Sequence, residues 1–213
     1  MSTNNRSRVK RSPKRGIYDR KEIYKILDQN FLCHVALIYE NSPLNIPTMY
    51  GREDDHIFIH GASVSRLIQS LENGVDVCIS IAQVNDLVLA RSAFHHSMNY
   101  ESVVIFGRAT LVDEKLKNHA LKVIYDHLIP GRWEEVRPPS DTELKATKVI
   151  KIEMVDVSAK SRTGGPIDDK EDYELPIWAG NIPYIHSFLQ PQTDPLMQAN
   201  LPIPESAAKK VAK

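Results

Sequence analysis

The sequence predicts a mainly β protein, an antiparallel barrel with a few helices between its strands. Short apolar runs recur along the chain, and most are joined by short turns rather than by long crossover connections. Only a few segments have the spacing of an amphipathic helix. No two of the 9 glycines are separated by a single residue. The chain therefore has no G-x-G-x-x-G or P-loop motif, and a parallel dinucleotide-binding fold is not expected.

The bulk composition is typical of one globular domain. A chain of 213 residues can bury a self-supporting core. Cys33 and Cys78 lie in apolar runs without a C-x-x-C partner, which favours buried thiols over a disulfide framework or a zinc site. No run approaches the roughly 18 apolar residues that span a bilayer, and no signal-peptide pattern is present. We expect a cytoplasmic protein without a metal site.

Positive charge is concentrated at one end of a chain that is neutral overall. Residues 1–15 contain no acid and hold Arg6, Arg8, Lys10, Arg11, Lys14 and Arg15. Such an arm can bind nucleic acid, act as a targeting signal or wrap a partner subunit. Binding of nucleic acid by this arm is not favoured, because no aromatic residues are interleaved with its basic residues and no DNA-binding motif follows it. We therefore expect a basic arm over 1–15, one domain over 16–190 and a flexible tail over 191–213.

The first half of the chain is predicted to form a helix followed by a strand meander. Asp19 and Glu22 make a capping-box-like start, and the apolar spacing that follows predicts a helix over 19–30. A second helix is predicted to begin near Ser65 and to end at Asn73-Gly74. The predicted strands are 32–39, 44–51 and 56–60, with turns at Asn41-Ser42-Pro43 and Glu53-Asp54-Asp55.

The second half is predicted to continue the antiparallel pattern. A helix over 114–128 ends at Pro130-Gly131, and Ser140 with Glu143 forms a capping box for a shorter helix. About seven strands are expected in all. The predicted strands of this half are 75–83, 86–93, 101–112 and 148–157.

Ser63, Ser65 and Arg66 stand where a predicted strand gives way to a helix. Unpaired backbone N–H groups and the positive end of the helix dipole favour an anion at such a junction. The hydroxyls add donors, and Arg66 can hold a phosphate through two hydrogen bonds. This pattern predicts a phosphate site. The alternative is an ordinary serine N-cap beside a solvated arginine.

A polar segment between two apolar strands is the second candidate. It holds His95, His96, Ser97, Asn99 and Tyr100. Polar side chains in such a position are typical of a binding site or an interface. Adjacent strand residues point to opposite sides and no third ligand lies nearby, so hydrogen bonding is favoured over metal binding.

Four blocks of the sequence resemble the pyridoxamine 5′-phosphate oxidase superfamily, in its flavin-binding, nitroimidazole-reductase-like branch. They are Ile59-His-Gly-Ala-Ser63 with Ser65-Arg66, then Arg91 to Tyr100, Pro130-Gly-Arg-Trp133 and Pro176-Ile-Trp-Ala-Gly180. The likeness runs from about Arg11 to Pro183. It implies a mainly β, antiparallel, Greek-key-like FMN-binding split barrel, whose homodimer holds two FMN molecules at the subunit interface.

The resemblance also implies the cofactor-binding residues. The phosphate and ribityl segment corresponds to His60, Gly61, Ala62, Ser63, Ser65 and Arg66. The strand beside the isoalloxazine corresponds to Thr48, Met49 and Tyr50. The segment that reaches the ring from the other subunit corresponds to Ser97, Asn99, Tyr100 and Ser102. Trp178 resembles a C-terminal aromatic residue near the ring, whereas Trp133 is equally well explained by packing.

Some positions depart from the family pattern. Glu101 stands where related sequences usually carry arginine, and Tyr50 stands where the oxidase tends to have lysine. The oxidase's basic substrate-phosphate cluster is not recognisable, so oxidation of pyridoxamine phosphate is not implied. The charged residues Lys160, Arg162, Asp168, Asp169 and Asp172 are either an ion-paired loop over the site or a solvated charge run.

The resemblance implies an FMN-dependent oxidoreductase that acts on a small molecule, with nitroreductase-like or related flavin chemistry. No catalytic side chain is assigned, because hydride transfer to a flavin needs none from the protein; His96 and Tyr100 are the candidate proton donors. Two alternatives stay open. One is a flavin carrier, scavenger or sensor without turnover, and the other is a haem-binding barrel that uses one of the 8 histidines as axial ligand.

Overall fold

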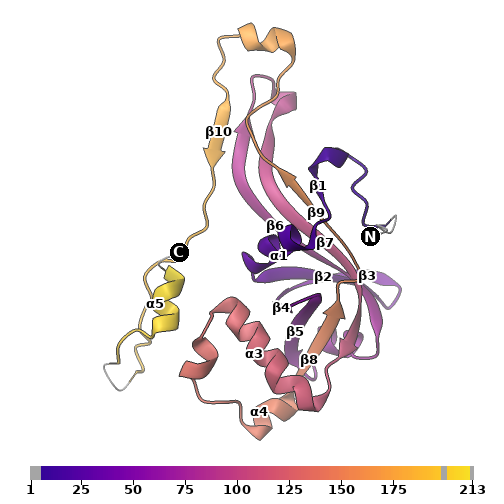
Figure 1. Cartoon of the computed structure of the whole chain (residues 1–213), viewed down its shortest axis with the longest axis vertical. Coiled ribbons are helices and arrows are strands. Elements are labelled where there is room, and N and C mark those ends of the chain that lie inside the picture. Colours follow the sequence, from indigo (N-terminus) through magenta and orange to yellow (C-terminus); the bar gives the residue numbers. More distant parts are fainter. Residues whose placement is uncertain (1–5, 198–200, 212–213) are drawn as a thin grey trace. The chain divides into compact units, whose positions relative to one another are not determined.

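The computed structural model describes residues 6–197 and 201–211 (Figure 1). Its strands follow one hydrogen-bonded path in the order β3-β2-β6-β7-β8-β5-β4, and the path does not close into a complete barrel. The contacts divide the chain into two compact units. The first unit contains the chain up to Pro47, Val77–Gly107 and Met154–Ile185, and the second contains the remainder. No described helix is long and apolar enough to cross a membrane.

The first unit is a set of antiparallel strands with one helix. Helix α1 (Arg20–Asp28) begins as predicted, because the Asp19 carboxylate accepts a hydrogen bond from the Glu22 N–H (3.1 Å). Its buried face consists of Ile23, Ile26 and Leu27. The strands that lie wholly or mainly in this unit are β1 (Gly16–Ile17), β2 (Leu32–Tyr39), β3 (Ser42–Met49), β6 (Val75–Leu89), β7 (Ser97–Leu111), β9 (Asp156–Arg162) and β10 (Gly180–Pro183).

Two predictions for this unit are wrong in their boundaries. The β2–β3 turn is formed by Glu40 and Asn41, which both have positive φ, so β3 begins earlier than predicted. The predicted strands 75–83 and 86–93 form one continuous strand, β6. One half of β6 pairs with β2 and the other half with β10, which accounts for its length. The polar segment that follows begins with a short 3-10 helix, Ala93–His95.

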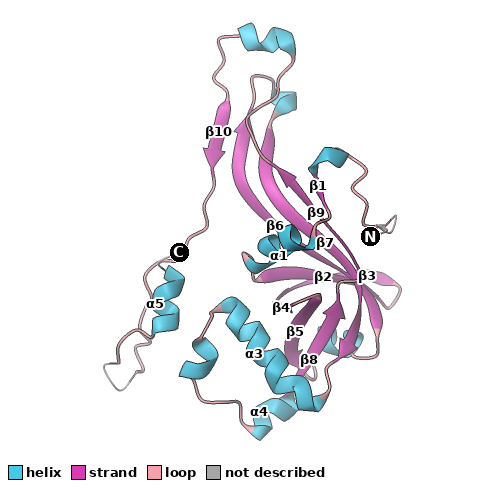
Figure 2. Ribbon diagram, viewed as in Figure 1, coloured by secondary structure: helices cyan, strands magenta, loops and turns pink. Residues whose placement is uncertain are grey.

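The second unit is a small sheet covered by helices (Figure 2). Strands β4 (Gly51–Glu53), β5 (His56–Ala62) and β8 (Thr147–Glu153) pair in that order, and β8 also pairs with Ala109–Leu111 of β7. Helices α3 and α4 lie beside β5 and β8 (Figure 2). The helices are α2 (Arg66–Leu71), α3 (Lys117–Leu128), α4 (Asp141–Ala146) and α5 (Glu205–Val211), with 3-10 turns at Glu114–Leu116 and Arg132–Glu135.

Local chemistry explains the helix ends of this unit. The capping box of α4 is confirmed, since the Ser140 hydroxyl and the Glu143 carboxylate each accept the other residue's backbone N–H. Gly131, with φ 85°, stands just beyond α3 as predicted. The predicted strand 148–157 is instead two strands, β8 and β9, with a break at Met154-Val155. Helix α5 lies in the segment predicted to be a flexible tail, and its Ser206 N–H donates to the Glu135 carboxylate (3.2 Å).

Candidate cofactor sites

A cavity of about 590 Å³ lies on the helical side of the second unit and opens to solvent. Helices α3 and α4, the 3-10 turn Arg132–Glu135 and strand β5 contribute its walls. Volumes of this size are typical of sites for small molecules and cofactors. Most of the wall is apolar or aromatic. The lining residues are His60, Leu121, Tyr125, Arg132, Trp133, Val136, Arg137, Pro139, Glu143, Leu144 and Thr147.

The position of α3 in this wall is fixed by a close approach to β4. A Cβ atom on Gly51 would lie only 2.5 Å from the Ile124 Cα atom, so only glycine fits there. The buried side chains of Phe58 and Leu121 belong to the apolar cluster under the helix. The Lys117 Nζ atom donates to the Leu144 carbonyl oxygen (3.1 Å), which ties α4 to the start of α3. The cavity walls are therefore rigidly supported.

His60 is the only histidine among the lining residues. Strand β5 holds it in place by pairing with β8, in which Val149 stands opposite His60. Its ring lies 5.7 Å from the Tyr125 ring, between centroids. Within the described part of the chain neither ring nitrogen of His60 has a hydrogen-bond partner, and Nδ1 is also buried from solvent. Burial lowers the pKa of His60, so the imidazole is neutral at neutral pH.

Two arginines stand at the edge of the same cavity, each oriented by an acid. Arg132 donates to Glu135 (3.2 Å). Arg137 donates through both terminal nitrogens to Glu143 (2.8 and 2.6 Å). The hydrogen bonds from Arg137 and from Ser140 lower the pKa of Glu143 to about 2. A guanidinium has five N–H donors, so each arginine retains donors for an anionic ligand.

The predicted phosphate corner lies on the other face of β5. Alternate strand residues face opposite sides, so Phe58 and His60 share the α3 face and Gly61 faces α2. A Cβ atom on Gly61 would lie 3.0 Å from the Ile68 side chain of α2 and 3.5 Å from the Ser65 hydroxyl. The structure therefore separates the side chain of His60 from Gly61 and Ser65, whereas Ala62 shares the His60 face and pairs with the cavity residue Thr147.

The amides of this corner are less available than the sequence predicts. The Ser63 N–H donates to the Ala146 carbonyl (2.8 Å), and the Ser65 N–H donates to the Ala62 carbonyl (2.9 Å). The Ser65 hydroxyl caps α2 by accepting from the Ile68 N–H (3.4 Å). The prediction of unpaired amides is thus wrong for Ser63 and Ser65, because a long-range bond to Ala146 uses the first amide and a local turn bond to Ala62 uses the second. Arg66 is exposed at the start of α2.

The residues predicted beside the isoalloxazine have different environments. Tyr50 is completely buried, and its ring lies 4.8 Å from the ring of His127. Thr48 and Met49 are half-buried at the end of β3. A second, more charged hollow of about 370 Å³ lies next to this region and is lined by Arg52, Glu53, His119, Lys122, Val123, Asp126 and His127.

In the first unit, Asn99 is the centre of a buried polar network. Its amide nitrogen donates to Asp86 (2.8 Å) and to the Gly164 carbonyl (3.0 Å), and its oxygen accepts from Arg162. Arg162 also donates to the Gly165 carbonyl (3.1 Å). Asn99 and Arg162 are both buried. Within this unit Asn99 therefore fixes the loop after β9.

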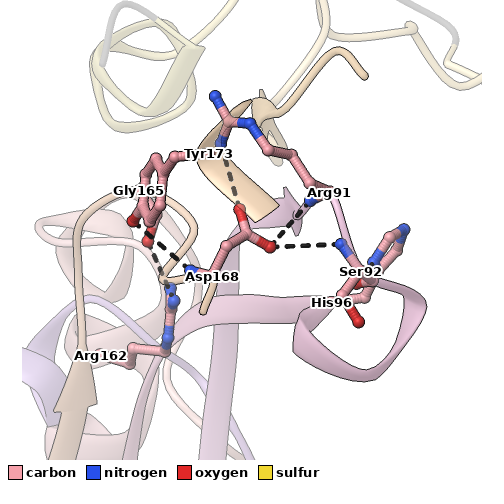
Figure 3. A network of polar contacts seen from close by, with 7 residues as sticks. All are labelled: Arg91, Ser92, His96, Arg162, Gly165, Asp168 and Tyr173. Atoms are coloured by element: carbon pink, nitrogen blue, oxygen red, sulfur yellow. Dashed lines mark hydrogen bonds and ion pairs between the residues drawn. The ribbon is translucent and has the colours of Figure 1, made fainter. Parts of the chain in front are cut away.

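The same loop is clamped a second time by Asp168 (Figure 3). Its carboxylate accepts from the backbone N–H groups of Arg91 (2.9 Å) and Ser92 (3.2 Å) and from the Arg91 guanidinium (3.1 Å). The Arg91 guanidinium also lies over the Tyr173 ring, 4.9 Å from its centroid. Arg162 and Asp168 are thus part of an ion-paired and hydrogen-bonded loop, one of the two interpretations that the sequence left open.

The remaining predicted residues of this unit lie on its surface or along β7. Ser97 is exposed, whereas Tyr100 and Ser102 are half-buried on β7. Trp178 is 66% exposed. Ser102 donates to the Lys160 carbonyl (3.4 Å). Ser97, Asn99, Tyr100 and Ser102 therefore share one strand, because β7 begins at Ser97 and not at residue 101 as the sequence predicts.

The described part of the basic arm folds back on the first unit. Arg6 forms an ion pair with the buried Asp156 (3.9 Å) and lies over the Phe106 ring, 4.3 Å from its centroid. Strand β1 pairs with β9 through Gly16 and Ile17. Residues 1–5 of the predicted arm lie outside the described residues.

The family model described as pyridoxamine 5′-phosphate oxidase matches residues 19–161, well over half of the chain. The chain belongs to this family. Its strand pattern is that of the family's split barrel, so the fold predicted from the sequence is confirmed. No curated protein matches the chain.

Solved structures give a more specific comparison for this family member. The flavocytochrome Anf3 of Azotobacter vinelandii is 39% identical, with a TM-score of 0.92 over 98% of this chain and 97% of its own. The FAD- and haem-binding protein of Mycobacterium smegmatis is 30% identical, with a TM-score of 0.90 over 92% and 97%. A candidate 5-nitroimidazole resistance protein of Bacteroides thetaiotaomicron is 25% identical, with a TM-score of 0.58 over 68% and 85%.

Proposed function

We propose that this chain is a redox protein that binds both a flavin and a haem. One observation carries the proposal: its likeness to a flavocytochrome covers 98% of the chain at 39% identity. A second neighbour, described as binding FAD and haem, is similar over 92% of the chain. Haem binding, an alternative in the sequence analysis, thus joins flavin binding in one function.

The described residues fit such a pair of cofactors. The cavity of the second unit offers apolar walls, a histidine that has no hydrogen-bond partner within the described part of the chain, and two arginines at its edge. The opposite face of β5 carries the predicted phosphate corner with Ser65 and Arg66. When bound, a flavin supplies two-electron and one-electron chemistry and a haem supplies one-electron chemistry. The chain's own task is to hold, orient and shield the two groups.

Of the two flavin nucleotides, we propose FAD rather than the FMN predicted from the sequence. The support is the description of the M. smegmatis neighbour, which names FAD. The test is the cofactor content of the purified full chain, measured as released flavin by chromatography and as haem by its pyridine complex. We expect FAD and haem together. Released FMN would overturn the choice of nucleotide. Failure of the chain to bind haemin, or to bind either flavin nucleotide, on reconstitution would overturn the proposal.

We further propose a homodimer, supported by exposed apolar side chains in and beside strands β6, β7 and β10 of the first unit; these strands are labelled in Figure 1. Leu87 and Ile182 are register partners, and both are about half exposed. Phe94 is 89% exposed. Exposed apolar side chains that gather in one region of a surface are typical of a contact surface. Light scattering should give twice the chain mass, and Leu87→Asp should give a monomer with reduced flavin content. A monomeric parent protein would contradict the dimer.

Oxidoreductase activity is the last part of this proposal. Under anaerobic conditions NAD(P)H should bleach the flavin absorption, and a small-molecule acceptor should restore it. The likeness to the candidate nitroimidazole resistance protein makes a nitroaromatic the first acceptor to try. A bound flavin that no pyridine nucleotide reduces would instead favour a carrier or sensor.

A further inference from the structure

The cavity of the second unit and the side chain of His60 lie on one face of β5, and the predicted phosphate corner lies on the other. We propose that this cavity holds the haem, with His60 as a ligand of the iron and Arg132 and Arg137 binding the haem carboxylates. The inference rests on the proposed function and names the site of one of its two cofactors.

The shape and lining of the cavity suit a tetrapyrrole. A haem is a flat apolar disc with carboxylates on one edge, and it requires apolar walls with cations along one side. Leu121, Trp133 and Leu144 supply apolar wall, and the cavity volume of about 590 Å³ is in the range of cofactor sites. Arg132 and Arg137 both come from the segment that follows α3, and both line the cavity.

His60 has the properties of an iron ligand. Its ring lines the cavity and makes no protein hydrogen bond in the described chain, and its Nδ1 atom is buried without a partner. A buried polar atom without a partner is costly and calls for a ligand or another functional explanation. Because His60 lies inside the β5–β8 ladder, with paired residues on either side of it along β5, the imidazole is held on a rigid element.

Arg132 and Arg137 are each oriented by a neighbouring acid, and one of these acids, Glu143, itself lines the cavity. Glu143 accepts two hydrogen bonds from Arg137 and one from the Ser140 N–H (2.7 Å). Glu135, the partner of Arg132, also accepts from Ser206 of α5. The acids therefore orient the guanidiniums, whose remaining N–H donors can bind carboxylates.

The flavin is the competing occupant, and the lining argues against it. The family resemblance assigns the flavin phosphate to the segment that ends at Ser65 and Arg66, and the Ser65 hydroxyl lies beside Gly61 on the α2 face of β5. Among the described residues that line the cavity there is no glycine, and Thr147 supplies the one aliphatic hydroxyl. We therefore infer that the haem and the flavin phosphate occupy different faces of β5.

The decisive variant is His60→Ala in the full chain, compared with His119→Gln. His119 is on α3 but lies outside this cavity and pairs with Glu53 (2.9 Å). Each protein is reconstituted with haemin, and the Soret band, haem content and flavin content are recorded. His60→Ala should lose the parental Soret spectrum and most of its haem, keep its flavin and recover a Soret band with added imidazole. His119→Gln should match the parent.

Two further variants keep the test conclusive if His60→Ala folds poorly. Leu144→Trp fills the cavity without touching the proposed ligand, and it should exclude haemin while flavin remains. Arg132→Ala should weaken haemin binding about tenfold or more, whereas Arg108→Ala, at an exposed arginine of the same unit, should not.

The outcomes separate this inference from the proposed function. A parental chain that binds no haem refutes the proposed function. A parental chain with haem, together with an unchanged Soret band in His60→Ala, refutes only the site. Loss of flavin with retention of haem in His60→Ala would show that the flavin occupies the cavity.

Discussion

Replacing Gly51 by alanine tests whether α3 rests directly on β4. The new Cβ atom would lie 2.5 Å from the Ile124 Cα atom, 2.7 Å from its nitrogen and 2.8 Å from the Val123 carbonyl carbon. All three are backbone atoms, so no side chain can rotate away and the helix itself must shift. Overpacking of this kind costs about 3 kcal/mol. For a chain of this size that corresponds to a fall in Tm of roughly 6–12 °C.

Thermal unfolding followed by circular dichroism measures the effect, and Gly165→Ala is the matched control. A Cβ atom on Gly165 meets nothing within 4 Å, so the control should stay within about 0.5 kcal/mol of the parent. Because α3 carries Leu121 and Tyr125 of the cavity, Gly51→Ala should also weaken haemin binding. A Gly51→Ala protein with parental Tm would refute the reasoning.

Three other outcomes are expected. Asp168→Asn removes the charge that holds Arg91, so it should lower Tm and speed proteolysis of residues 164–175; unchanged cleavage would contradict the clamp. Glu143 has a pKa of about 2 when folded and 4.5 ordinarily, so its stabilising contribution is complete above pH 4.5 and is lost as the pH falls through 2. Glu143→Gln should therefore reduce the fall in the free energy of unfolding between pH 4.5 and 2, measured by urea titration at each pH. A fall as steep as that of the parent would contradict this role of Glu143. Burial raises the pKa of the Cys33 thiol to about 12, so native protein at about pH 8 should not react with a thiol reagent there until urea is added; rapid modification would be inconsistent with that burial.

Local signals predicted the helices well. The cap at Asp19 and the capping box at Ser140 are satisfied within a few residues of sequence, so residue types alone identify them. The strand breaks were harder to predict. Residues 148–157 alternate without a glycine or proline, yet the chain changes pairing partner at Met154, which is a consequence of long-range register.

The cavity depends on contacts that the sequence does not display. Its walls come from β5, α3, the turn at Arg132 and α4, which approach one another only in the folded unit. One signal was present: strand alternation places His60 on the same face as Phe58 and away from Gly61. The resemblance groups His60 with the phosphate segment by its place in the family motif, whereas the side chains of His60 and Gly61 face opposite sides of β5.

The ratio of haem to flavin in the purified chain tests the central claim most directly. Two cofactors on separate faces of β5 should give one haem and one FAD per chain, with both a Soret band and flavin absorption in the same spectrum. A chain that takes up flavin but no haemin, even after reconstitution, would contradict this account.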